Sequence, residues 1–121
     1  MSQSLRKKIL GVSDRPLRES GEVPEWGFQV WIRTISAAEK MWLYDRVRDG
    51  VIPYPDLVCV GLGDEDGARV FAEGDVDAIA DKNPRALAYV GELVLAHNRM
   101  RPVDLKDAEK NSEPIPSSSG S

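Results

Sequence analysis

The stretch NPRALAYVGELVLAHN, Asn83 to Asn98, decides the fold because it holds the strongest helical pattern in the chain. Asn83 is a good N-cap residue, and Pro84 suits the first helical position. Apolar positions then recur with helical spacing at Leu87, Val90, Gly91, Val94 and Leu95. This spacing predicts an amphipathic helix with one apolar face. Asn98 is expected to end the helix as a C-cap, and a buried specificity residue is the alternative.

The composition fits one soluble globular domain. The chain has 121 residues, 41% hydrophobic and 30% charged, with a formal net charge of -4 and both signs interspersed. The only basic cluster is Arg6-Lys7-Lys8, so nucleic acid is not an expected partner. The single cysteine, Cys59, fits a reducing compartment. No apolar run resembles a signal peptide or approaches the roughly 20 residues of a membrane span. We therefore expect a cytoplasmic protein without membrane association.

The segments before residue 50 predict a short helix, a β-hairpin and a longer helix. Ser4 begins an amphipathic helix that ends at Gly11 and must dock on another surface. Residues 18–23 and 28–34 alternate as strands, with turn residues between them. Ser36 and Glu39 form a capping box, which predicts a helix to about residue 48.

Two tryptophans fall on otherwise polar faces of these elements. In the second strand Trp31 shares a face with Gln29 and Arg33, opposite the apolar positions 28, 30 and 32. In the following helix Trp42 lies away from the expected apolar stripe, which consists of Ala37, Met41, Tyr44 and Val47. Such residues fit an interface as well as burial by neighbouring elements.

The central segment has an ambiguous start and an acidic turn. Residues 54–62 are apolar at both the helical spacing and the strand spacing, so the sequence fits either a strand or a helix there. The turn that follows contains Asp64, Asp66 and Gly67, then a short extended piece to Phe71 and a brief helix around Ile79.

The acidic turn resembles a calcium loop but lacks key ligands. With Gly67 at loop position 6, Asp64, Asp66 and Glu73 fall at ligand positions. However, Leu62 takes the place of the first carboxylate and Arg69 that of the usual aliphatic residue. We therefore expect a solvated turn, with no metal and no cofactor. A calcium-responsive module is the alternative that a calcium titration tests.

No catalytic motif is recognisable. His97, the only histidine, has no partner at ligand spacing, and no nucleophile elbow or phosphate-binding loop is present. We expect a protein that is not an enzyme. Residues 102–110 suggest a short charged helix, and residues 111–121 are too polar to fold. The predicted fold is α+β and predominantly helical, with an N-terminal β-hairpin packed on a small helical bundle. It forms one domain, 1–110, with a disordered C-terminal tail, 111–121.

The order of these features resembles the tail assembly chaperones of long-tailed bacteriophages. The resemblance covers roughly residues 26–113 and rests on short motifs in collinear order: WIRTISAAE, GDEDGARVF, GDVDAI, NPRALAYVGELVLAHN and KNSE. It implies that Asp64, Asp66 and Gly67 form a structural turn, that Phe71 is a core anchor and that Asn98 closes the long helix.

The resemblance also implies a function. Such proteins bind the tape-measure protein in the host cytoplasm, keep it soluble until tail-tube protein polymerises around it, and are absent from the mature virion. A small phage or bacterial adaptor or inhibitor that binds one folded partner is the alternative. Because a holdase needs uncovered apolar surface, we expect Trp31, Trp42 and Arg33 to form the partner or self-association contact. Trp26, in the hairpin turn, is expected to matter less. Unpaired hairpin edges further predict a homo-oligomer.

Overall fold

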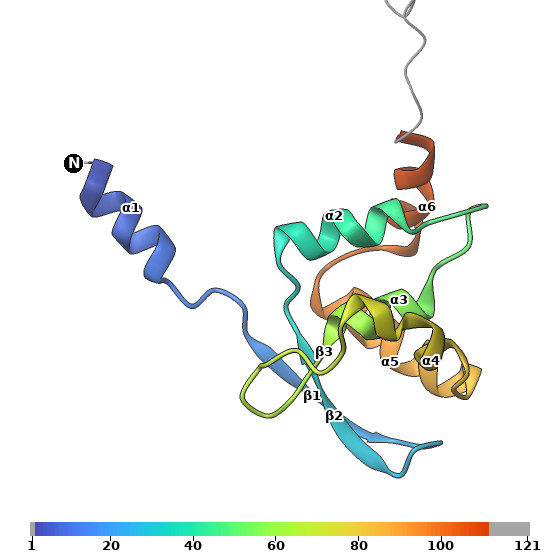
Figure 1. The fold of residues 1–121 in the computed structure, drawn as a ribbon. Helices are drawn as coiled ribbons and strands as arrows, with labels where there is room; N and C mark the ends of the chain where they lie inside the picture. Colours follow the sequence, from blue (N-terminus) through green and yellow to red (C-terminus); the bar gives the residue numbers. More distant parts are fainter. Residues whose placement is uncertain (1, 112–121) are drawn as a thin grey trace, which may run out of the picture.

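A three-stranded antiparallel sheet and a set of short helices make up the fold in the computed structural model, which describes residues 2–111 (Figure 1). The predicted α+β, mainly helical class with an N-terminal hairpin is confirmed. The elements follow the order α1 (Ser2–Gly11), β1 (Leu17–Val23), β2 (Phe28–Arg33), α2 (Ala37–Asp45), α3 (Tyr54–Gly61), β3 (Leu62–Gly63), the 3-10 turn η1 (Glu73–Asp75), α4 (Val76–Ala80), α5 (Pro84–His97) and α6 (Pro102–Asn111). The predicted disordered tail lies outside the described residues, apart from Asn111.

The sheet has the order β1-β2-β3, with the predicted hairpin as its main part. In β1 and β2, Leu17 pairs with Arg33 at one end and Val23 with Phe28 at the other, with a register shift between positions 19 and 22. Gly21 lies in that shift with a φ of +73°, a conformation that glycine adopts without strain. On β2, β3 reaches only positions 31 and 32, and Gly63 of β3 also forms an isolated bridge with Arg69. Within the described residues, the hairpin end of β2 therefore has no strand neighbour on that side.

The segment that the sequence left open is a helix followed by a strand. α3 covers Tyr54–Gly61, and the extended residue Leu62 ends it and begins β3. All of residues 56–61 are buried, because α3 lies among β2, α2, α4 and α5. A helix enclosed on every side has no polar face to reveal its period. The ambiguity of the sequence therefore reflects the position of α3 in the core.

The capping box of α2 is confirmed, but the predicted apolar stripe of this helix is wrong. Ser36 and Glu39 make both reciprocal bonds, and the helix ends at Asp45, with Arg46 as C-cap. The fully buried residues here are Leu43 and Val47. Of the stripe that the sequence predicted, Val47 is buried and Tyr44 half-buried, but Ala37 is exposed and Met41 is 67% exposed. α2 packs on α3 and α6 with the side that carries Leu43, which turns Met41 toward solvent.

The core forms where α5 packs on α3 and on the sheet. Two glycines allow the helices to approach closely. A Cβ on Gly91 would overlap Cδ1 of Tyr54, and a Cβ on Gly61 would overlap Cγ2 of Val94. The predicted apolar face of α5 is confirmed, since Leu87, Val90, Gly91, Val94 and Leu95 are all buried.

The first helix is the exception to this packing. Figure 1 shows α1 projecting away from the rest of the molecule, and residues 3–11 are all exposed. Leu5, Ile9 and Leu10 are 59%, 60% and 68% exposed. The sequence predicted that this helix docks on another surface. In the isolated chain its apolar side chains are left uncovered.

Candidate partner-binding surfaces

An apolar groove lies between the end of the hairpin and α4. We call it the hairpin groove; it has a volume of about 410 Å³ and is lined by Trp26, Phe28, Val30, Val58, Leu62, Gly63, Val70, Phe71, Asp75, Ala78, Ile79 and Lys82. Only Asp75 and Lys82 among these carry charge. The groove opens beside the part of β2 that the short β3 does not cover. The groove can accept a row of apolar side chains from a partner protein.

Aromatic side chains from the hairpin form one wall of the groove. The rings of Trp26 and Phe28 stack with centroids 6.1 Å apart, and Phe28 is 58% exposed. Of the lining residues outside the hairpin, Val70 is 53% exposed, while Phe71 is half-buried and packs against the core. Large aromatic rings contribute most of the contact energy in many interfaces. Trp26, which the sequence analysis expected to matter less, is thus part of the groove.

Acidic residues accompany the groove. Asp75 lines it, Glu73 precedes it in η1, and Asp77 and Asp81 belong to α4 and its C-cap. Glu25 lies in the hairpin turn next to Trp26 and is exposed. Of these five carboxylates only Asp75 lines the groove, where Lys82 supplies one opposite charge. An apolar segment of a partner would complement the lining, and basic side chains beside that segment would complement the carboxylates outside the lining.

The two predicted contact tryptophans are half-buried and lie outside the hairpin groove. Trp31 is on the central strand, paired with Glu19 and Gly63. Trp42 packs against the core, with the guanidinium of Arg46 5.3 Å from the ring centroid. The structure does not bring these two residues together with the groove. Their predicted role in a contact stays a prediction.

Arg33, the third predicted contact residue, belongs to a buried ionic cluster. Its Nη1 lies 3.3 Å from Oε2 of Glu39 and also donates to the carbonyl of Val60. Nη1 of Arg69 lies 3.3 Å from the same carboxylate oxygen, and Nη1 of Arg15 lies 4.0 Å from the other. The Arg33 side chain is only 8% exposed, which suits a structural role better than an open contact.

The electrostatics of Glu39 follow from this cluster. Burial alone raises the pKa of the Glu39 carboxyl, but the hydrogen bond from the Ser36 N–H and the charges of Arg33 and Arg69 outweigh burial and lower the pKa. The carboxylate therefore stays ionised. It caps α2 and holds together residues from the linker after α1, from β2 and from the loop before η1.

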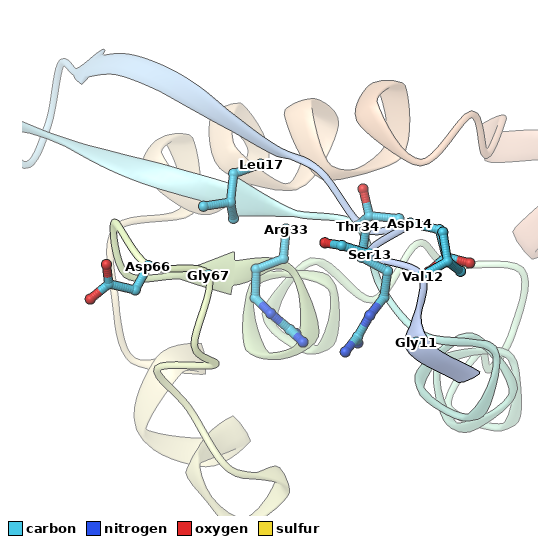
Figure 2. A pocket seen from close by; sticks show the side chains of 10 residues that line it. Gly11, Val12, Ser13, Asp14, Leu17, Arg33, Thr34, Asp66 and Gly67 are labelled. Atoms are coloured by element: carbon cyan, nitrogen blue, oxygen red, sulfur yellow. The ribbon is translucent and has the colours of Figure 1, made fainter. Parts of the chain in front are cut away.

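A polar cavity of about 500 Å³ lies beside Arg33. Residues 11–15, Leu17, Thr34, Asp66 and Gly67 complete its lining, and Figure 2 shows Arg33 extending between the linker and the loop of Asp66. Arg15 and Arg33 bring two positive charges to the lining, and Asp14 and Asp66 bring two negative ones. This balance gives the cavity no preference for an anion or a cation.

The acidic turn is held by its own backbone. Oδ1 of Asp64 accepts from the N–H groups of Asp66 and Ala68, both at 2.9 Å. The Gly67 N–H donates to the Asp64 carbonyl at 3.0 Å, with Gly67 at a φ of +88°. One ligand oxygen of a calcium loop is therefore already used by the turn. Among residues 2–111, no three His, Cys, Asp or Glu side chains gather to hold a metal ion.

Asn98 joins the end of α5 to the sheet. Its Nδ2 donates to the carbonyls of Val94, at 3.0 Å, and Arg33, at 3.1 Å, and its Oδ1 accepts from the Ile35 N–H at 2.9 Å. It is thus the C-cap of α5 and a bridge to the strand end. Next to it, Nε2 of His97 lies 2.8 Å from Oγ1 of Thr34 and 3.0 Å from the Pro16 carbonyl. These contacts give His97 a place in holding the chain together.

Cys59 lies in the centre of the molecule, in α3. The residue is fully buried, its thiol donates to the Ala72 carbonyl at 3.2 Å, and Nη2 of Arg69 lies 3.4 Å from Sγ. Burial raises the pKa of the thiol, although the nearby Arg69 lowers it in part. The thiol is therefore a packed, protonated group rather than a poised nucleophile.

Within residues 2–111, no helix combines the length and apolar character that crossing a bilayer requires. Comparison with family models, characterised proteins and solved structures finds no match to this chain.

Proposed function

We propose that this protein is a tail assembly chaperone of a long-tailed bacteriophage. In this proposal it acts in the host cytoplasm without catalysis, binds the tape-measure protein, keeps it soluble until tail-tube protein polymerises around it, and stays out of the virion. The proposal rests on the collinear motifs between residues 26 and 113. The observation that supports it best in the structure is the hairpin groove, an open apolar surface of the kind that a holdase requires.

The shape of the groove suits a helical segment. An amphipathic helix presents apolar side chains at every third or fourth position, and such a row fits an apolar channel bordered by aromatic rings. Trp26 and Phe28 would contact this row from the hairpin side, and Phe71 and Ile79 from the other. A tape-measure protein with long helical stretches offers many such rows. Each copy of the chaperone would therefore bind one short helical segment of the tape-measure protein, and many copies would bind along its length.

Coexpression with the tape-measure protein tests the proposal. We expect the wild-type chain to keep that protein in the soluble fraction and to copurify with it. Phe28→Asp, which places a charge in the groove at an exposed position, should abolish both effects without unfolding the chain. Met41→Asp is the matched control, because Met41 is a similarly exposed apolar residue on α2, outside the groove lining.

The outcomes separate the two classes of function. If wild type and both variants leave the tape-measure protein insoluble, the chaperone proposal is wrong. If the chain instead binds only one folded protein, it is an adaptor or inhibitor. If Phe28→Asp and Met41→Asp chaperone equally well, the function can stand but the groove is not its site, and Trp31 and Trp42 become the next surface to substitute.

A further inference from the structure

We infer that α1 of one copy docks in the hairpin groove of a second copy of this chain. The inference goes beyond the proposed function, and it depends only on surfaces of this protein. It starts from a helix that lacks the packing it needs. An isolated helix of about ten residues is marginal in water, and tertiary packing of its apolar side normally stabilises it. On α1 that side consists of Leu5, Ile9 and Leu10, all more than half exposed.

The groove has the complementary character. Its lining includes two exposed apolar residues, Phe28 and Val70, which no element of the described chain covers. An amphipathic helix laid into this channel would remove apolar surface from water on both partners. The apolar side of α1 and the hairpin groove are both uncovered in the single chain, and each would cover the apolar surface of the other.

Charge selects this pairing over others. α1 carries Arg6, Lys7 and Lys8 and no acidic residue, which gives it a charge of +3. Because the net charge of the whole chain is -4, the residues outside α1 together carry -7. Asp75 lines the groove, Glu25 precedes the lining residue Trp26 in sequence, and Glu73 lies in η1 with Asp75. Two α1 helices side by side would instead bring six positive charges together. Complementary charge therefore favours α1 in the groove over α1 against α1.

The chain geometry assigns the groove to a second copy. The Pro16 carbonyl is bonded to Thr34 and His97, so the linker is held at the Leu17 end of the hairpin. The groove extends from the hairpin turn at Trp26 to Leu62 and Gly63 of β3, which pair with Ile32 and Trp31 of β2. The four free linker residues span at most about 14 Å. Figure 1 also shows α1 and α4 on opposite sides of the molecule. α1 therefore leaves its own groove uncovered in the single chain, and the groove of each copy is open to α1 of another copy.

Disulfide trapping between two differently labelled chains tests the contact. One chain carries Ile9→Cys on α1, and the other carries Ala78→Cys, an exposed position in the groove lining. We expect the mixed disulfide to form at least about tenfold faster than in a mixture of Ile9→Cys with Met41→Cys, since proximity raises effective concentration. Both partner positions are exposed, and Cys59 is buried in all chains. Equal rates for the two mixtures would overturn the inference.

Light scattering gives a second, independent measurement. We expect wild type to self-associate and Ile9→Asp to weaken association by about tenfold or more, the effect of losing one central apolar contact. Ser4→Asp makes the same change in charge on another side of α1 and should weaken association much less than Ile9→Asp. A monomeric wild type, or an Ile9→Asp variant that associates normally, would contradict the inference. Because no tape-measure protein is present, failure here leaves the proposed function to be tested separately.

Discussion

Glu39 is a single carboxylate shared by three arginines. Because its folded-state pKa lies below the ordinary 4.5, the ionised group contributes stability above about pH 4.5, and the contribution is lost as pH falls through the lower folded value. Glu39→Gln keeps the capping bonds of α2 but removes the charge. We expect a loss of about 2 to 4 kcal/mol in the free energy of unfolding at pH 7, slightly below the cost of breaking a fully buried pair.

The pH dependence separates charge from packing. Urea unfolding of wild type and Glu39→Gln should differ clearly at pH 7 and much less at pH 3, where wild type has lost part of this contribution. Glu65→Gln, in the exposed turn, is the control and should change little at either pH. An equal loss at both pH values would mean that the carboxylate charge does not stabilise the cluster.

Asn98 makes three side-chain hydrogen bonds, and the two with the Arg33 carbonyl and the Ile35 N–H connect α5 to the end of β2. Asn98→Ala should lower the free energy of unfolding by about 2 to 4 kcal/mol, since each bond contributes about 1 kcal/mol and the Ile35 N–H loses its acceptor. Asn83→Ala is the matched control. Asn83 caps the other end of α5 through local bonds only and should lose about 1 kcal/mol. Similar losses in chemical denaturation of both variants would contradict the bridging role.

At the scale of the elements, the packing of α3 on α5 reverses the usual effect of replacing a helical glycine. Gly→Ala in an exposed helix stabilises by about 1 kcal/mol. At Gly91 the new methyl group would meet the Tyr54 ring, so we expect Gly91→Ala to destabilise by about 1 to 3 kcal/mol. Gly74→Ala is the control, because nothing lies within 4 Å of a Cβ there. A Gly91→Ala variant as stable as wild type in thermal unfolding would show that the helices can separate at little cost.

The elements also show which signals in the sequence predict structure. Ser36 and Asn83 begin their helices as expected, because a cap depends on residues within three positions. The side of α2 that faces the core was not predictable in the same way. It depends on α6, which comes some 60 residues later in the chain. From the sequence alone, an apolar stripe that includes Met41 has helical spacing as good as one that includes Leu43. The two residues of β3 are too few to show any period.

The candidate surfaces depend still more on distant contacts. The cluster of Arg15, Arg33, Glu39 and Arg69 joins four separate segments, and nothing in the local sequence marks it. The hairpin groove combines Trp26 and Phe28 with residues of α4 for the same reason. Aromatic residues in the hairpin were a usable signal. Alternation groups Phe28 with Val30 and Ile32 on one apolar face, but Phe28 is exposed, because the short β3 pairs only beside Trp31 and Ile32 of β2.

At the scale of the whole molecule, α1 is separable from the remainder of the fold. We expect a chain that begins at Val12, after a new initiator methionine, to unfold with a free energy within about 0.5 kcal/mol of wild type, the range of surface changes. Its mass in light scattering should fall to that of the monomer. Denaturant unfolding of both chains at low concentration, where each is monomeric, gives the comparison. A clear loss of stability at that concentration would mean that α1 packs on its own chain.

The alkylation rate of the single thiol, at the centre of the fold, measures how often the molecule opens. Cys59 has no cysteine elsewhere in the chain to confuse its signal, and no part of its surface reaches solvent. An alkylating reagent can therefore react only in the moments when α3 is exposed. The reaction rate, divided by that of a free thiol, reads out the population of opened chains directly. A ligand that stabilises the closed fold would lower the alkylation rate of Cys59 as its occupancy rises. The natural cysteine can therefore report binding without any attached label.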